Sequence, residues 1–381
     1  MLKVRVLLTG GGTGGHIYPL MAVSEELESF AAQNNLITEL RYLGVPGSFR
    51  QELEAHHIRV SGLASSKLRR YFALQNFLDA PKFVISLFQA LWRVYWFMPD
   101  VLFSKGGTGS LAVIFACRFY KVPIFVHESD AVPGITNQIA ARYAKRIAIS
   151  FSGAARYFEG KNAALTGNPV RKFMFGEQDP QETAKKLFGF DPAKPLILVL
   201  GGSQGATRIN DFMFDNLSEL ITNYQILHQV GENNYEQAKG ELAFSQGKLS
   251  PEEKGSYKIV PYFEKNIKDA ISAADLVIAR AGSGTIFEIA AVGRPAVLIP
   301  LPEAANDHQR ANAYEFAGTG AAIVIEQDNL LVSIFFAQLK KLFENKELLK
   351  SMAEASKKFS KPDAAKLIAA EIIRVAKTYS L

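Results

Sequence analysis

The fold of this chain is set by the stretch Val4-Arg5-Val6-Leu7-Leu8-Thr9-Gly10-Gly11-Gly12-Thr13-Gly14-Gly15-His16, an apolar strand pattern that runs into a glycine-rich loop. The same arrangement returns at Leu196-Ile197-Leu198-Val199-Leu200-Gly201-Gly202-Ser203-Gln204-Gly205-Ala206. Loops with so little side chain let a ligand approach backbone N–H groups at the start of a helix, which is how α/β proteins hold phosphates and sugars. Two copies predict two such domains, with a ligand in the cleft between them.

Length and composition fit this expectation. With 381 residues the chain is long for one core and comfortable for two domains. A net charge of +6 favours an anionic partner, which could be a nucleic acid, an acidic membrane surface or a phosphorylated substrate. The one cysteine, Cys117, lies in an apolar run and excludes a disulfide framework. The first strand pattern leaves no room for a signal peptide, so we expect a cytoplasmic protein.

Short apolar strands alternate with helical patterns along the whole chain, which is typical of βαβ units and parallel sheets. The predicted strands span residues 4–9, 39–43, 101–103, 124–126 and 147–149 in the first half and 196–200, 225–230, 257–260, 276–279, 296–299 and 322–325 in the second. We therefore predict an α/β fold with two Rossmann-like, doubly wound domains. They are an N-terminal domain over 1–165, a turn-rich hinge over 166–171, a C-terminal domain over 172–358, and a last helix within 359–381 that packs back on the first domain.

Several common nucleotide sites are disfavoured. Gly10, Gly12 and Gly15 satisfy the dinucleotide pattern G-x-G-x-x-G, but the second predicted strand ends in Arg41-Tyr42-Leu43-Gly44 without the acid that holds a ribose. No Walker lysine follows a glycine loop, which excludes a P-loop nucleotidase. No Asp-x-Asp motif occurs and the histidines lack metal-ligand spacing, so neither a metal nor another cofactor is expected.

Two candidate catalytic residues follow strands of the first half. His16 stands at the first turn of a predicted helix, whose N-terminus disfavours imidazolium and leaves the ring able to accept a proton. Glu128 lies in His127-Glu128-Ser129-Asp130, at the carboxyl end of a strand where open α/β sheets bind ligands, and Asn137 is close in sequence. Each residue also has a structural interpretation. His16 could be a polar capping residue of the helix, and Glu128 could belong to a hydrogen-bonded loop that only shapes the cleft.

A third candidate is in the second half. Glu288 lies one turn into a predicted helix behind Gly282-Ser283-Gly284-Thr285. A carboxylate there can accept two hydrogen bonds from a ribose diol while the loop N–H groups bind phosphate oxygens, although it could equally be a helix-start glutamate. Arg171, in the predicted hinge, could reach a pyrophosphate.

The stretch over 68–98 combines aromatic and basic residues. Five basic side chains stand against one acid over 67–98, and the uncharged run 83–91 is too short to span a bilayer. The pattern predicts a core helix, and its aromatic residues beside basic ones also favour contact with an anionic membrane surface.

Together these stretches resemble the MurG family, the bacterial transferases that complete lipid II for peptidoglycan. The resemblance covers nearly the whole chain. It rests on Gly11-Gly12-Thr13-Gly14-Gly15-His16-Ile17-Tyr18-Pro19, His127-Glu128-Ser129-Asp130 with Pro133-Gly134-Ile135-Thr136-Asn137, Thr166-Gly167-Asn168-Pro169-Val170-Arg171, Gly201-Gly202-Ser203-Gln204-Gly205-Ala206, the loop from Gly282 to Glu288, and Asp307-His308-Gln309 with Asn312-Ala313.

The resemblance implies a two-domain GT-B fold. It also implies metal-independent, inverting transfer of GlcNAc from UDP-GlcNAc to the 4-hydroxyl of the muramoyl sugar of lipid I. Such a protein would lie peripherally on the cytoplasmic face of the bacterial inner membrane, with an anionic membrane surface as partner and no nucleic acid.

The resemblance further implies residue roles. His16 and Glu128 are the candidate bases. The donor-binding residues are Thr13, Gly14, Gly15, Asp130, Arg171, Ser203, Phe263, Gly282, Ser283, Gly284, Thr285, Glu288 and Gln309, and the acceptor-binding residues are Gly106, Gly107, Thr108 and Asn137. The chain departs from the family at Asp130, where asparagine is frequent, and at Thr108, where many members have tyrosine.

Other interpretations stay open at this point. A UDP-GlcNAc 2-epimerase, or a transferase to a different lipid, would share the architecture. A non-catalytic sugar-nucleotide or membrane-docking subunit would tolerate loss of His16. A nucleic-acid binder is suggested by charge alone, and no known nucleic-acid motif accompanies it.

Overall fold

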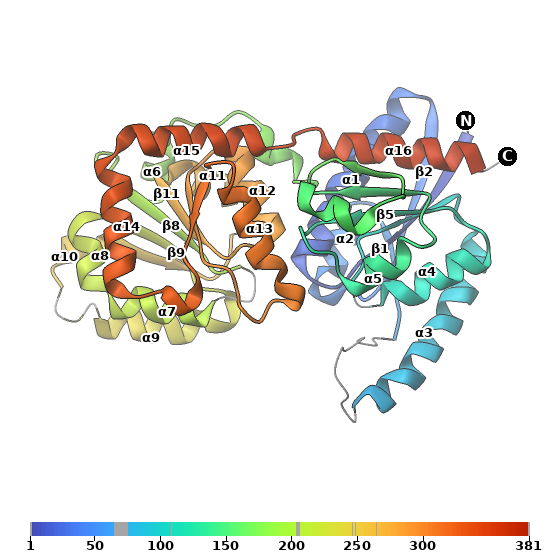
Figure 1. The fold of residues 1–381 in the computed structure, drawn as a ribbon, viewed down its shortest axis with the longest axis horizontal. Coiled ribbons are helices and arrows are strands. Elements are labelled where there is room, and N and C mark those ends of the chain that lie inside the picture. The colour runs from blue at the N-terminus through green and yellow to red at the C-terminus, as the bar shows by residue number, and fades with distance from the viewer. Residues whose placement is uncertain are drawn as a thin grey trace. The chain divides into compact units, whose positions relative to one another are not determined.

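The computed structural model describes residues 2–64, 75–107, 109–202, 206–245, 247, 249–263 and 265–379. The chain forms two compact units, each built on a parallel sheet flanked by helices (Figure 1). The first unit consists of Met1–Arg171 with Lys361–Leu381, and the second of Lys172–Ser360.

The sheet of the first unit has seven parallel strands in the order β3-β2-β1-β4-β5-β6-β7. Their bounds are β1 Leu2–Thr9, β2 Leu36–Gly44, β3 Arg59–Gly62, β4 Val101–Ser104, β5 Ile124–Glu128, β6 Arg146–Ile149 and β7 Ala163–Leu165. The strand order reverses between β1 and β4, where Thr9 pairs with Ser104. Ligands of open α/β sheets bind at such a switch point, beyond the carboxyl ends of the strands.

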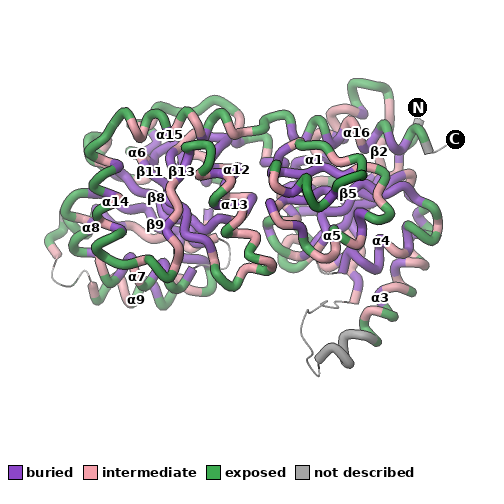
Figure 2. Tube along the Cα trace, viewed as in Figure 1, coloured by how far each residue is buried: buried purple, intermediate pink, exposed green. Residues whose placement is uncertain are grey.

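Helices cover both faces of this sheet, as a parallel sheet requires. They are α1 Gly14–Gln33, α2 Arg50–Ala55, α3 Gln75–Phe97, α4 Ser110–Phe119, α5 Ile135–Ala140 and α16 Ala364–Tyr379, with short 3-10 turns η1 Gly47–Phe49 and η2 Ser152–Phe158. Because side chains alternate along a strand, Val6 and Leu8 enter the core formed with α1 and α16, whereas Leu7 enters the core formed with α3 and α4. The last helix is therefore part of the first unit's core, and Figure 2 shows this buried interior.

The second unit repeats the design with six parallel strands in the order β10-β9-β8-β11-β12-β13. Their bounds are β8 Leu196–Leu200, β9 Gln225–Gln229, β10 Tyr257–Val260, β11 Leu276–Ala279, β12 Ala296–Leu298 and β13 Ala322–Val324. Its switch point lies between β8 and β11.

The helical segments of the second unit lie around this sheet. They are η3 Lys172–Phe175, α6 Gln181–Leu187, α7 Thr207–Asp215, α8 Leu217–Asn223, η4 Glu232–Asn234, α9 Tyr235–Ser245, α10 Pro251–Gly255, α11 Ile267–Ala273, α12 Ser283–Val292, η6 Ala305–Asp307, α13 His308–Ala317, η7 Gln327–Asn329, α14 Val332–Glu344 and α15 Lys346–Phe359.

Every strand predicted from the sequence is present, with ends that differ by a few residues. The structure adds β3 and β7, which are the two edges of the first sheet. The predicted α/β class with two doubly wound units is confirmed. No helix in the described ranges is long and apolar enough to cross a membrane.

Candidate active site

In the first unit, two glycine loops meet at the switch point. The loop after β1 and the loop after β4 approach so closely that a Cβ on Gly107 would lie 2.8 Å from the backbone nitrogen of Gly11. Gly107 also has a φ of +84°, a conformation that L side chains rarely adopt. Glycine is therefore required there both by conformation and by space.

His16 lies between these loops, in the first turn of α1. A Cβ on Gly11 would lie 2.9 Å from its Nδ1, and one on Gly107 would lie 3.1 Å from its Nε2. Nδ1 is 2.9 Å from Oγ1 of Thr13. If Nδ1–H donates to this hydroxyl, Nε2 keeps the lone pair that a general base needs. Gly15, directly before the histidine, is exposed, and a Cβ there would meet nothing within 4 Å apart from its chain neighbours.

Glu128, the other candidate base, ends β5 and is buried, with 3% of its surface exposed. Its Oε1 accepts a hydrogen bond from the Asp130 backbone (2.9 Å). Its Oε2 accepts from the Gly134 backbone (3.2 Å) and from Nδ2 of Asn137 (2.9 Å). Burial, followed by the charge of Asp130, raises the pKa of Glu128 to about 7. The carboxylate thus organises the loop that follows it, and its lone pairs are already engaged.

Asn137, a predicted acceptor-binding residue, has a fixed orientation. Its Nδ2 donates to both the carbonyl of His127 and the carboxylate of Glu128. Its Oδ1 consequently points toward Gly106, where a Cβ would lie only 2.5 Å away. This buried oxygen accepts no hydrogen bond within the part of the chain that the structure describes.

Lys105 is a functional candidate that the sequence reasoning missed. It lies between β4 and Gly106, is 2% exposed, and its amine contacts His127 within β5 and Ser129 directly after it. Burial lowers the pKa of Lys105 to about 7, against the opposing charges of Glu128 and Asp130. The available signal in the sequence was a lysine directly behind the short strand Val101–Ser104, whose first three residues are apolar.

Arg171 belongs to the first unit. Its guanidinium carbon lies 4.4 Å from the ring centroid of Tyr18 on α1, a cation–π contact that holds it near the helix that carries His16. Asp130 is half-buried, and its backbone N–H supports Glu128. Thr108, and Ser203 of the second unit, lie outside the described residues.

In the second unit, the predicted donor residues from Gly282 to Thr285, with Glu288, form the start of α12, which follows β11 at the switch point. Gly282 precedes this helix, and a Cβ on it or on Gly284 would meet nothing within 4 Å. The N-terminal N–H groups of Ser283, Gly284 and Thr285 lack partners within the helix because no earlier turn exists, which is the arrangement that binds phosphate. Glu288 is half-buried on the second turn of the same helix.

Two other predicted donor residues are held by local contacts. Phe263 is 2% exposed, its ring packs edge-on against Phe188 at 6.1 Å, and its backbone N–H donates to Oε1 of Gln229 at 3.2 Å. Gln309 lies in the first turn of α13, and its Oε1 accepts a hydrogen bond from the backbone of Leu301 at 3.1 Å.

Arg280 is a second residue that the sequence reasoning did not assign. It follows β11 and donates to the carbonyls of Ile299 and Pro300 and to Gln327. It therefore fixes the loop after β12 next to the start of α12. Within the described ranges, no group of three or more His, Cys, Asp or Glu side chains is arranged to hold a metal ion.

Two doubly wound units, each with a glycine loop at its switch point, constitute the GT-B fold of glycosyltransferases. Residues 6–149 match the model of the glycosyltransferase family 28 N-terminal domain, and residues 196–368 match that of the C-terminal domain.

Curated relatives are similar over almost the full chain. A Clostridium botulinum protein named UDP-N-acetylglucosamine–N-acetylmuramyl-(pentapeptide) pyrophosphoryl-undecaprenol N-acetylglucosamine transferase is 32% identical over 94% of this chain and 99% of its own. A protein of the same name from Desulforamulus reducens is 34% identical over 95% of this chain and 96% of its own.

The solved structures agree. The crystal structure of Acinetobacter baumannii MurG has a TM-score of 0.72 and 28% identity, and the match covers 97% of this chain and 99% of that one. A Staphylococcus aureus MnaA–UDP structure has a TM-score of 0.70 at 14% identity, covering 100% of this chain and 98% of that one, which shows the common fold alone. The chain belongs to the MurG family of glycosyltransferase family 28.

Proposed function

We propose that this chain transfers N-acetylglucosamine from UDP-N-acetylglucosamine to the 4-hydroxyl of the muramoyl sugar of lipid I, undecaprenyl-pyrophosphoryl-MurNAc-pentapeptide, and so forms lipid II. The observation that carries the proposal is the full-length similarity to transferases of that name. The site geometry supports it, because each unit has a glycine loop at a helix start, and the first adds a histidine beside its loop.

The reaction forms a bond between the acceptor O4 and C1 of the donor sugar, on the face opposite the leaving group. It breaks the bond from C1 to the diphosphate oxygen, so the electron pair leaves with UDP and the anomeric configuration inverts. The acceptor proton passes to Nε2 of His16, whose Nδ1 side is occupied by Thr13. Catalysis then depends on binding the departing charge more strongly in the transition state than in the substrate.

The second unit would hold the donor. The N–H groups at the start of α12 would take diphosphate oxygens, and Glu288 would accept hydrogen bonds from the ribose diol. Ser203 and Arg171 would add contacts to the diphosphate, Phe263 and the loop from Gly282 to Thr285 would surround the uracil, and Gln309 would face the sugar. In the first unit, Thr13, Gly14, Gly15 and Asp130 would complete the donor contacts.

The acceptor would lie against the first unit. Gly106 and Gly107 lie where an added side chain would collide with Asn137 and with the loop after β1, and the buried Oδ1 of Asn137 offers an acceptor for a hydroxyl or amide donor. Thr108 would extend this surface. Glu128 would keep the loop in place rather than remove the proton, because its carboxylate is buried behind three donors.

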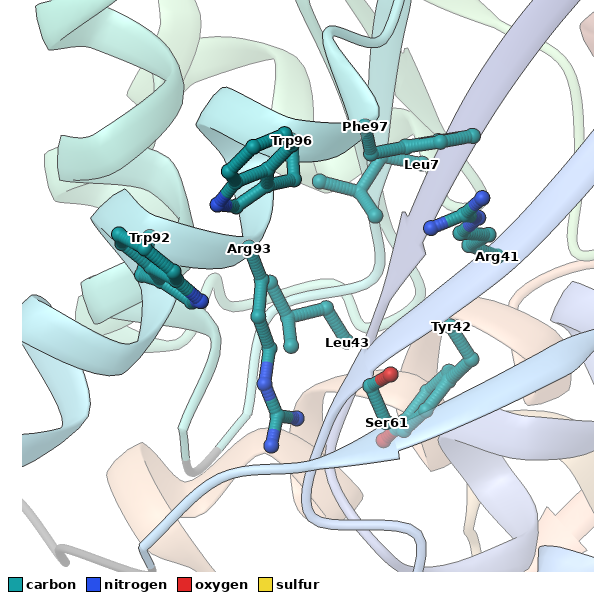
Figure 3. Close-up of a pocket in the computed structure, with 9 residues that line it drawn as sticks. All are labelled: Leu7, Arg41, Tyr42, Leu43, Ser61, Trp92, Arg93, Trp96 and Phe97. Atoms are coloured by element: carbon teal, nitrogen blue, oxygen red, sulfur yellow. The ribbon is translucent and has the colours of Figure 1, made fainter.

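A lipid acceptor needs a membrane contact, and α3 is suited to provide it. Phe88, Trp92 and Trp96 are 68%, 65% and 66% exposed, although all are large and apolar. Beside them, a cavity of about 200 Å³ between α3 and the first sheet is lined by both tryptophans together with Arg41 and Arg93 (Figure 3). Aromatic side chains next to arginines favour the anionic headgroup region of a bilayer. Residues 65–74, part of the predicted basic–aromatic stretch, lie outside the described residues.

The product of the reaction tests the proposal. The protein is incubated with UDP-GlcNAc and a lipid I analogue, and the lipid fraction is analysed by mass spectrometry and proton NMR. We expect one added N-acetylhexosamine in β linkage to the muramoyl O4. Conversion of UDP-GlcNAc into its 2-epimer, without a lipid product, would contradict the proposal.

A further inference from the structure

Gln229 is the last residue of β9, and only 3% of its surface is exposed. In the sheet of the second unit, β9 lies between β8 and β10. Gln229 is paired with Leu200 at the end of β8 and with Val260 at the end of β10. The loops that follow these two strands therefore both begin beside Gln229.

The side-chain amide of Gln229 joins the two loops. Its Nε2 donates to the carbonyl oxygen of Gly202 at 3.1 Å, and its Oε1 accepts from the backbone N–H of Phe263 at 3.2 Å. The carbonyl needs a donor and the N–H needs an acceptor, which also settles the orientation of the amide. Glutamine supplies both groups at the tip of one side chain, whereas an ionised carboxylate can only accept.

The strand end that carries Gln229 is held in place through its neighbour His228. Nδ2 of Asn210 on α7 donates to the Val230 carbonyl at 3.0 Å, so Oδ1 of Asn210 faces Nε2 of His228, also at 3.0 Å. Nε2 then carries the proton, and Nδ1 accepts from the Tyr257 hydroxyl at 2.8 Å. Burial lowers the pKa of His228 to about 3, so the ring is neutral and this bonding pattern persists at neutral pH. The Gln229 amide thus extends from a fixed strand end.

The two loops have separate roles in the proposed function. The diphosphate is assigned to the loop after β8, through Ser203, which follows Gly202 in the sequence, and the uracil is assigned to Phe263. One UDP molecule must then contact both loops, and its covalent length sets the distance at which they can bind it together. A site gains affinity when its parts are already held in the bound arrangement.

We propose that Gln229 is a positioning residue of the donor site: its amide holds the diphosphate loop and the uracil loop in the arrangement that UDP binds. The inference rests on the proposed function, since that function assigns the two ends of UDP to these loops. Gln229 acts through the backbone of Gly202 and Phe263 rather than on the reacting atoms.

Calorimetric titration with UDP, without any acceptor, compares Gln229→Met and Gln229→Glu with wild type at about pH 5.5 and about pH 8.5. Methionine has a similar length but neither an N–H donor nor a strong acceptor. We therefore expect Gln229→Met to bind UDP roughly tenfold more weakly than wild type at both pH values. The ratio to wild type at the same pH removes the titration of the UDP phosphate itself.

Gln229→Glu should respond to pH. Burial favours the neutral carboxyl group, whose O–H can donate to Gly202 while its carbonyl oxygen accepts from Phe263, as the amide does. At the lower pH we expect a UDP affinity within about threefold of wild type. Ionisation at the higher pH removes the donor and sets a negative oxygen against the Gly202 carbonyl. The affinity there should fall to the level of Gln229→Met or below.

Gln237→Met and Gln237→Glu are the controls. They change an exposed glutamine on α9 of the same unit and should bind UDP as wild type does at both pH values. Wild-type affinity in Gln229→Met would overturn the inference, because the amide would then be dispensable. An equal loss in Gln229→Glu at both pH values would also overturn it, because it would indicate a packing defect. If Gln229→Met fails to fold, the pH response of Gln229→Glu decides.

The titration separates this inference from the proposed transfer reaction, which is judged by its lipid product. If wild type binds UDP but forms no lipid product, the transfer reaction fails and the pH response still decides the role of Gln229. If wild type forms the product and the Gln229 variants bind UDP as tightly as wild type, only the inference fails. A wild type that binds no UDP overturns the inference as well, since there would be no UDP site for Gln229 to organise.

Discussion

At the scale of single residues, the structure separates the two candidate bases. His16 sits half-buried between two glycine loops with space beside Gly15, whereas Glu128 is buried and engaged by three donors. A group that removes a substrate proton must reach the substrate, so the geometry favours His16. Neither role was decidable from the sequence, because both residues follow a strand and both are polar.

We predict that His16→Ala lowers kcat by about 10²- to 10⁴-fold, the usual contribution of a general base. The apparent affinity for UDP-GlcNAc should change little, because the proposed contacts to uridine and ribose lie in the second unit. Steady-state kinetics with a lipid I analogue measure both parameters. An equal change in kcat and in donor KM would show that His16 binds the donor instead.

For Glu288→Ala we predict the opposite pattern, in which donor binding weakens and kcat changes little. Charge-assisted hydrogen bonds are worth roughly 1.5–3 kcal/mol, so losing those to the ribose should weaken UDP binding roughly 10- to 100-fold. Calorimetric titration with UDP measures this directly. Glu347→Ala, at an exposed position of the same unit, is the matched control. Unchanged UDP affinity in Glu288→Ala would remove this residue from the donor site.

At the scale of elements, most strands were predictable, because a parallel strand buried on both faces appears as a continuous apolar run. The exceptions, β3 and β7, are edge strands of four and three residues that are largely half-buried or exposed. The sequence of β3, Arg-Val-Ser-Gly, has no apolar run, and that of β7, Ala-Ala-Leu, is only three residues long and has no β-branched or aromatic residue. Lys105 was missed for a similar reason, since only the folded sheet brings His127, Ser129 and Asn168 to its amine.

The prediction at the scale of elements concerns membrane binding by helix α3. Replacing Trp92 and Trp96 together by serine should reduce binding to anionic vesicles at least fivefold and leave product formation from a soluble acceptor analogue intact. Co-sedimentation with phosphatidylglycerol and phosphatidylcholine vesicles, at low and high salt, measures the effect. Phe244→Ser, at a 90% exposed aromatic of the second unit, is the control. Binding of the double variant at the wild-type level would exclude α3 as the contact.

At the scale of the whole molecule, the two units repeat one plan. In each unit, one glycine loop follows the strand on one side of the switch point, β1 or β8. A second glycine loop follows the strand on the other side, β4 or β11. Each also has a buried cation at that second loop, Lys105 in the first unit and Arg280 in the second. Each cation makes hydrogen bonds at the end of the next strand: Lys105 to His127 and Ser129 at the end of β5, and Arg280 to the carbonyls of Ile299 and Pro300 after β12. The repeated glycine loops were visible in the sequence, but the burial of the cations was not.

The central claim is that this chain moves GlcNAc to a lipid acceptor, and it is tested most directly by UDP release from UDP-GlcNAc with and without a lipid I analogue. The account predicts release that depends on the analogue, equals the amount of disaccharide lipid formed, and persists in the presence of a metal chelator. Release at the same rate without any acceptor would contradict it and would indicate a hydrolase.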